Sequence, residues 1–151
     1  MRYLLDTNIV SELRKGSRCD LAVVAWEQAE LIPLGGVISV LTIGEIRKGI
    51  ELISERDRRQ AARLEAWLTG LFQEFVGRIL PVSREVAEEW GRLNALRPLP
   101  AVDSLLGATA KAHALILATR NVRDLRAVGV HVVNPFEFGA GPRDNVNSGN
   151  A

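Results

Sequence analysis

The sequence predicts an α/β fold with a mainly parallel central sheet, and three observations carry that prediction. Its 151 residues suit one domain. Short apolar runs of strand length recur along the chain. The segments between them place apolar residues three and four positions apart, as amphipathic helices do. Strands that alternate with helices in this way are typical of a parallel sheet connected by crossover helices.

Five strands and three clear helices are expected. The strand-like runs occupy residues 2–5, 37–40, 79–82, 115–118 and 130–133. The helical patterns cover residues 55–76, 83–97 and about 102–113. Ser83 is expected to cap the second of these helices, and Pro98 and Pro100 end it.

The chain is expected to form one domain over residues 1–138. The segment from Gly139 is polar and rich in glycine and asparagine, so we expect a flexible C-terminal tail at residues 139–151. No apolar stretch is long enough for a transmembrane helix, and the first strand begins at once, so neither a membrane anchor nor a signal peptide is expected. Cys19 is the only cysteine, which excludes an intrachain disulfide and suits a cytoplasmic protein.

Four acidic residues lie where strands end or helices begin. Asp6 follows the first strand, Glu45 lies about one turn after the second, Asp103 opens the helix after the prolines, and Asp124 follows the fourth strand. Each has an ordinary structural explanation when it is taken alone, such as a helix cap worth ~1 kcal/mol for Asp6. Together they are expected near the carboxyl edge of one parallel sheet, where open α/β proteins place their sites.

Converging carboxylates require a cation. Several negative charges within a few ångströms repel one another, so some must take up protons or bind a metal. Oxygen ligands without cysteine or histidine select Mg²⁺, or alternatively Mn²⁺, over Zn²⁺.

Five segments carry a resemblance to a known family: LLDTNIVSE (4–12), TIGEIRKGI (42–50), AVDSLLGATA (101–110), LATRNVRDL (117–125) and VVNPF (132–136). In this order and at this spacing they resemble the PIN-domain family, and within it the VapC/FitB-type toxins of type II toxin–antitoxin systems. The match runs from Met1 to about Phe138. Small departures, such as Leu125 where an aromatic residue is common, affect packing positions and none of the acids.

The resemblance implies a three-layer α/β/α fold and a Mg²⁺-dependent ribonuclease. It also implies a homodimer that a small DNA-binding antitoxin inhibits. Asp6, Glu45, Asp103 and Asp124 fall on the family's acidic positions, and Asn8, Thr119 and Asn121 fall on the polar positions that support them. Asp6, Asp103 and Asp124 would hold the metal, and Glu45 would hold a second metal or orient the attacking water.

Three arginines are candidates for contacts with RNA phosphates: Arg14, Arg47 and Arg120. Ion pairing with neighbouring acids, or plain solvent exposure, is an equal alternative for all three. The net charge of +1 excludes a uniformly basic nucleic-acid-binding surface.

Two other functions stay open. A catalytically silent PIN scaffold would bind RNA or a partner without cleaving it. A receiver-like phosphoacceptor would also gather acids around Mg²⁺, but it needs two adjacent acids after the first strand and a late lysine. Here Asp6 stands alone, and Thr119-Arg120-Asn121 follows the fourth strand.

Overall fold

The computed structural model describes residues 1–140, so the expected tail falls outside the described residues from Gly141 onward. Within this range the chain forms five strands: β1 (Tyr3–Leu5), β2 (Gly36–Ser39), β3 (Ile79–Leu80), β4 (Ile116–Ala118) and β5 (Val132–Val133). The main helices are α1 (Thr7–Leu13), α2 (Leu21–Trp26), α4 (Val40–Ile53), α5 (Arg58–Glu74), α6 (Arg84–Leu96), α7 (Ala101–Ala112) and α8 (Val122–Ala127). Shorter helical segments are η1 (Gly16–Arg18), η2 (Glu27–Leu31), α3 (Ile32–Leu34) and η3 (Pro135–Glu137).

All strand pairs in the described residues are parallel, in the order β3-β2-β1-β4-β5. The predicted parallel sheet is therefore confirmed. Central β1 pairs with β2 on one side and with β4 on the other, so that Leu4 lies opposite both Val37 and Leu117. The connections leave β1 in opposite directions, and the carboxyl end of such a strand is where α/β folds place ligands.

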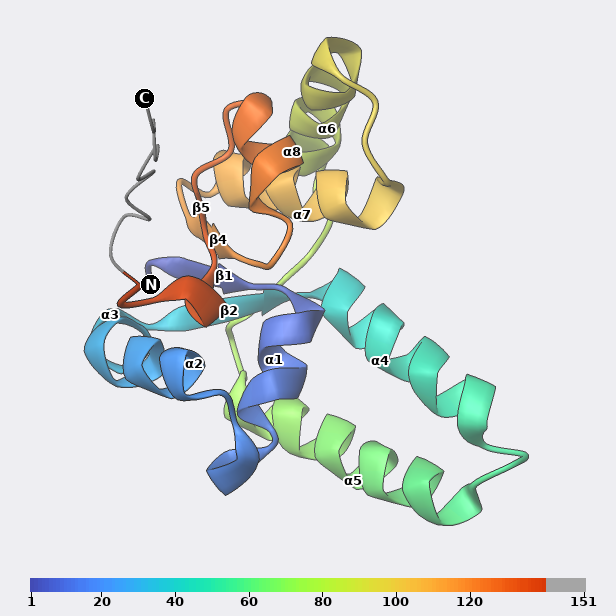
Figure 1. Cartoon of the computed structure of the whole chain (residues 1–151). Helices are drawn as coiled ribbons and strands as arrows, with labels where there is room; N and C mark the ends of the chain where they lie inside the picture. Colours follow the sequence, from blue (N-terminus) through green and yellow to red (C-terminus); the bar gives the residue numbers. More distant parts are fainter. Residues whose placement is uncertain (141–151) are drawn as a thin grey trace, which may run out of the picture.

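Helices cover both faces of this sheet (Figure 1). Alternate side chains of β1 point to opposite faces. Tyr3 and Leu5 pack in a core with α1, α2, α4 and α5, and Leu4 packs in a second core with α6, α7 and α8. The three-layer α/β/α architecture implied by the resemblance is therefore confirmed.

The three predicted helices are also present, but one of them begins later than predicted. Ser83 caps α6 as expected, because its hydroxyl accepts a hydrogen bond from the backbone N–H of Val86. The helix predicted at 55–76 begins only at Arg58, so its predicted start was wrong. Asp57 is the N-cap, with its carboxylate accepting from the backbone N–H of Gln60 at 2.9 Å, and the residues before it form the turn from α4. Across residues 1–140, no helix is both long and apolar enough to cross a membrane.

Candidate active site

Asp6 lies at the carboxyl end of β1 and is the N-cap of α1. Its Oδ1 accepts a hydrogen bond from the backbone N–H of Thr7 at 2.7 Å, which satisfies one of the free donors at the helix start. Its Oδ2 accepts from the Thr119 hydroxyl at 2.6 Å and from the Asn8 side-chain amide at 3.2 Å. Asp6 is only 7% exposed, so a charged group that water normally solvates is held here by protein donors.

Glu45 and Asp103 come to this neighbourhood from two different helices. Glu45, on α4, accepts a hydrogen bond from the Thr7 hydroxyl at 2.6 Å through its Oε1. Asp103, in the first turn of α7, accepts from the Asn121 side-chain amide at 2.9 Å through its Oδ2. Burial raises the pKa of Asp6, and the negative charges of Glu45 and Asp103 raise it further, against the hydrogen bonds from Thr119 and Thr7. Glu45 and Asp103 are therefore close enough for their charges to act on Asp6, and we call these three carboxylates the acidic cluster.

Asp124 has a different environment. Its Oδ1 forms an ion pair with the Arg97 guanidinium at 2.9 Å, and the two side chains are 37% and 52% exposed. Arg97 directly follows the last residue of α6, and Asp124 lies in the first turn of α8. Sequence analysis did not predict that Arg97 would pair with Asp124. The only local indication was its position beside Pro98, which marks the end of the helix.

Hydroxyl and amide side chains hold the acidic cluster in place. Asn8 and Thr119 donate to Asp6 and Asn121 donates to Asp103, so the structure places all three polar residues beside acids. The hydroxyl of Thr119 also accepts from the backbone N–H of Asn121 at 3.2 Å, which links the two supports. Sequence analysis missed Thr7, although it directly follows Asp6 and holds Glu45.

The donor chemistry of the acidic cluster fits a hard cation, because all of its ligands are carboxylate oxygens. The arrangement is not a closed ligand set, however. Within residues 1–140 no three His, Cys, Asp or Glu side chains are gathered as they would be around a metal ion. Separate hydrogen bonds hold each carboxylate instead, and each carboxylate keeps lone pairs beyond them.

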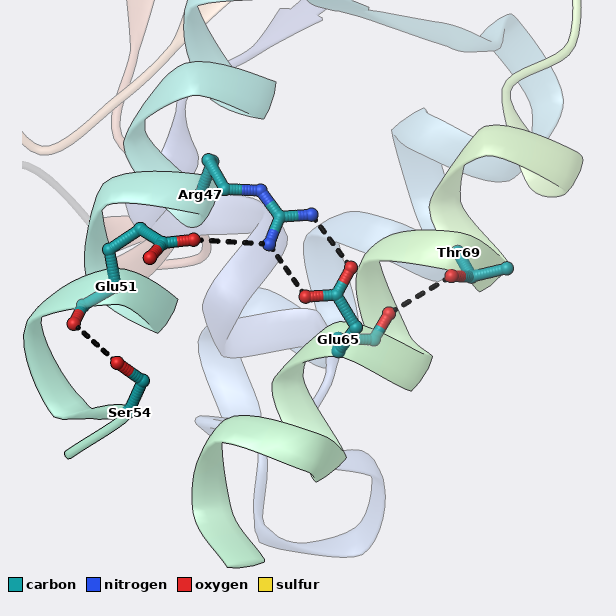
Figure 2. Close-up of polar contacts among 5 residues, drawn as sticks. All are labelled: Arg47, Glu51, Ser54, Glu65 and Thr69. Atoms are coloured by element: carbon teal, nitrogen blue, oxygen red, sulfur yellow. Dashed lines mark hydrogen bonds and ion pairs between the residues drawn. The ribbon is translucent and has the colours of Figure 1, made fainter. Parts of the chain in front are cut away.

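The three candidate arginines differ in how far other groups engage them. Both terminal nitrogens of Arg47 bind Glu65 on α5, at 2.6 and 2.7 Å, and Glu51 lies 3.6 Å from one of them (Figure 2). Arg47 therefore takes the ion-pairing alternative. Arg14 stacks over the ring of Trp67 at 5.0 Å, and Arg120 stacks over the ring of Phe136 at 3.7 Å. Stacking leaves the N–H donors of a guanidinium available at its edge.

The chain is thus a parallel α/β/α protein with acidic residues after β1 and near the starts of α4 and α7. Comparison with known families identifies the family to which it belongs. The PIN domain model matches residues 3–130, and the chain belongs to the PIN domain family.

Its relatives include VapC ribonuclease Y4jK of Sinorhizobium fredii, which is 32% identical over 141 residues that cover 89% of this chain and 97% of the relative. Toxin FitB of Neisseria gonorrhoeae is 34% identical over 140 residues, which cover 88% of this chain and 97% of the relative. A crystal structure of FitAcB from Neisseria gonorrhoeae superposes with a TM-score of 0.79 at 30% identity, covering 90% of this chain and 99% of the other.

Proposed function

We propose that this chain is a metal-dependent endoribonuclease and the toxin of a toxin–antitoxin pair. The observation that carries the proposal is Asp6, a buried carboxylate that Glu45 and Asp103 repel. Repulsion of a buried carboxylate by two others destabilises the folded protein, and a bound cation offsets that repulsion. The names of two relatives, a ribonuclease and a toxin, support the same assignment.

Asp6 and Asp103 would hold Mg²⁺ or Mn²⁺, and Asp124 would join them by exchanging its ion pair with Arg97 for the cation. The ion, when bound, supplies positive charge that lowers the pKa of a water molecule and neutralises the phosphate. Thr119 and Asn8 fix the orientation of Asp6, and Asn121 fixes that of Asp103. Glu45 is bound by Thr7 through Oε1, which leaves its Oε2 to orient the attacking water and accept its proton.

The test combines cleavage with metal binding. Purified protein is expected to cleave structured RNA with Mg²⁺ or Mn²⁺ and to stop in EDTA, and calorimetry is expected to detect Mn²⁺ binding without any RNA. Robust cleavage by demetallated protein would contradict metal dependence. RNA binding without cleavage in either metal would favour the silent scaffold.

We also propose that a small antitoxin occupies an apolar groove beside α1. The groove is a cavity of about 340 Å³. Three charged residues, Arg14, Glu27 and Glu74, line it together with seven apolar ones, namely Leu5, Val10, Leu13, Leu31, Trp67, Leu71 and Phe75. An apolar segment in this groove would supply most of the affinity. A basic residue of the partner, best an arginine, would then neutralise Asp6, Asp103 and Asp124 and so inhibit the enzyme.

Co-purification with the partner tests this proposed inhibition. Replacing the partner's site-facing basic residue with alanine is expected to restore cleavage while the complex persists, because the apolar contacts remain. Tight binding with full inhibition by that variant would show that the partner blocks access of RNA instead.

We propose, finally, a homodimer. The resemblance implies it, and large apolar side chains are exposed on two helices, namely Phe72 on α5 and Trp90 and Leu96 on α6. A second copy packed against either helix would bury these side chains. Light scattering at micromolar concentration is expected to give twice the chain mass of 16.6 kDa, and the mass of a monomer would contradict the proposal.

A further inference from the structure

A pocket lined almost entirely by basic side chains lies at the end of α1. Ser11, Arg14, Lys15 and Arg18 line this basic pocket, and its volume is about 510 Å³. Three cations line one polar cavity, and in the described part of the chain only the charge of Lys15 is paired, with Glu12. An anion in the cavity would therefore relieve the repulsion between Arg14 and Arg18. The pocket is separate from the acidic cluster, and neither the carboxylates nor their hydrogen-bond donors line it.

One face of α1 connects the two sites. Thr7, which binds Glu45, and Ser11, which lines the basic pocket, are four residues apart and so lie on the same side of the helix. Arg14 follows on that side, and at 1.5 Å per residue it lies about 10 Å along the helix axis from Thr7. A ligand at the acidic cluster that extends along α1 therefore reaches the basic pocket.

Neighbouring groups hold two of the three cations of the pocket, Lys15 and Arg14, in position. Lys15 forms an ion pair with buried Glu12 at 2.5 Å, and Arg14 stacks over Trp67. The hydrogen bond from Lys15 lowers the pKa of Glu12, and the charge of Arg120 contributes to that effect, so Arg120 also lies close to this part of α1. Cations that are already positioned lose less side-chain entropy when they bind an anion.

We infer that the basic pocket binds a backbone phosphate of the RNA, at a distance from the phosphate held at the acidic cluster. This inference rests on the proposed ribonuclease function. A stacked strand advances about 3.4 Å per nucleotide, so a distance of about 10 Å corresponds to about three nucleotides. A polyanion suits this pocket better than an apolar peptide does, because its lining residues are three cations and a serine.

The experiment compares arginine variants by their affinity for RNA. The variants are Arg18→Gln, the double variant Arg14→Gln/Arg18→Gln, and the control Arg126→Gln. Arg126 is exposed on α8 and lines a different, shallow pocket with residues of β4 and β5. The probe is a fluorescein-labelled single-stranded RNA in EDTA, and anisotropy gives its Kd over a series of KCl concentrations.

Arg18→Gln is expected to raise Kd about tenfold at low salt, the size of one charge-assisted hydrogen bond. The double variant is expected to lower the slope of log Kd against log salt by about 1.4, since each lost phosphate contact removes about 0.7. The control is expected to match the wild type in both respects.

Unchanged affinity and slope in both test variants would overturn the inference and leave the ribonuclease proposal standing. Loss of a co-purified protein partner with unchanged RNA binding would assign the pocket to that partner and overturn the inference too. If the wild type neither binds nor cleaves RNA, both proposals fail together.

Discussion

The starts of α1 and α5 are built alike and differ in their surroundings. An aspartate caps each helix: Asp6 accepts from the backbone N–H of Thr7, and Asp57 accepts from that of Gln60. Asp57 is exposed, and water solvates its charge. Asp6 is buried, receives two further side-chain hydrogen bonds, and lies close to two other acids.

The difference shows that a capping aspartate becomes a candidate ligand through contacts distant in sequence. Thr119, which donates to Asp6, lies 113 residues further along the chain and reaches it because β4 pairs with β1. Local sequence supplies the cap in both helices, whereas sheet topology supplies the rest of the site in only one.

The largest expected effect is on RNA cleavage, when the two capping aspartates are changed to asparagine and compared. Asp6→Asn keeps the shape and the capping oxygen but removes the charge that the metal needs, so RNA cleavage is expected to fall by at least about 10³-fold, equivalent to about 4 kcal/mol. Asp103→Asn is expected to act in the same way. Asp57→Asn is the matched control and is expected to cleave like the wild type.

Cleavage rates under single-turnover conditions, with circular dichroism to verify folding, measure this effect. Wild-type cleavage by folded Asp6→Asn would remove Asp6 from the reaction. An equal loss in the Asp57 variant would mean that the cap itself matters, and the proposed difference between the two aspartates would be wrong.

The fold could be predicted from the sequence because it follows from short-range apolar patterns, whereas the polar residues beside the acids came from the family resemblance. Apolar runs located all five strands to within two residues at each end. The resemblance led to Asn8, Thr119 and Asn121, which the structure places beside acids.

The ion pairs could not be predicted in the same way. Arg97 meets Asp124 because the end of α6 approaches the start of α8, and Arg47 meets Glu65 because α4 and α5 run side by side. These contacts depend on how helices pack in three dimensions, and apolar periodicity sets only which face is buried.

The second prediction concerns the donor that distinguishes Asp6 from Asp57. Thr119→Val is expected to lower the free energy of unfolding by about 1–3 kcal/mol, because a buried carboxylate loses its shortest hydrogen bond. Mn²⁺ affinity is expected to fall about 10- to 100-fold. Thermal denaturation and calorimetry measure the two quantities.

Thr109→Val is the control for Thr119→Val. Thr109 is equally buried, but its hydroxyl donates to the backbone carbonyl of Leu105 within α7 and contacts no acid. Its Mn²⁺ affinity is expected to equal that of the wild type. If the two variants lose metal affinity equally, the Thr119 hydroxyl has no special part in orienting Asp6.

The third prediction concerns pH. Because burial and the neighbouring acids raise the pKa of Asp6, the folded protein binds more protons than the unfolded chain between the ordinary aspartate pKa and the raised value. The contribution of Asp6 to stability therefore falls as pH rises through that window. Asp6→Asn is expected to gain stability over the wild type at neutral pH and to lose that gain in acid, below the ordinary pKa.

Denaturant titrations in EDTA at the two pH values measure this gain. The comparison is between the variant and the wild type at each pH, which cancels the titration of groups common to both proteins. A gain of the same size at both pH values would mean that ionisation of Asp6 costs the folded state nothing.

The smallest effect is expected at the ion pair between α4 and α5 (Figure 2). Arg47 and Glu65 are about half exposed, so water and salt screen their attraction, and holding two long side chains costs entropy. Glu65→Gln and Arg47→Gln are each expected to shift Tm by less than about 4 °C. In a double-mutant cycle the coupling energy between Arg47 and Glu65 is expected to weaken as salt is added.

RNA affinity separates this structural role of Arg47 from the phosphate contact that the sequence also allowed. Because Glu65 already binds both terminal nitrogens of Arg47, Arg47→Gln is expected to leave Kd for RNA unchanged, whereas Arg18→Gln raises it. If Arg47→Gln weakened RNA binding and Glu65→Gln strengthened it, Glu65 would be competing with RNA for Arg47, and the pair would belong to the substrate surface.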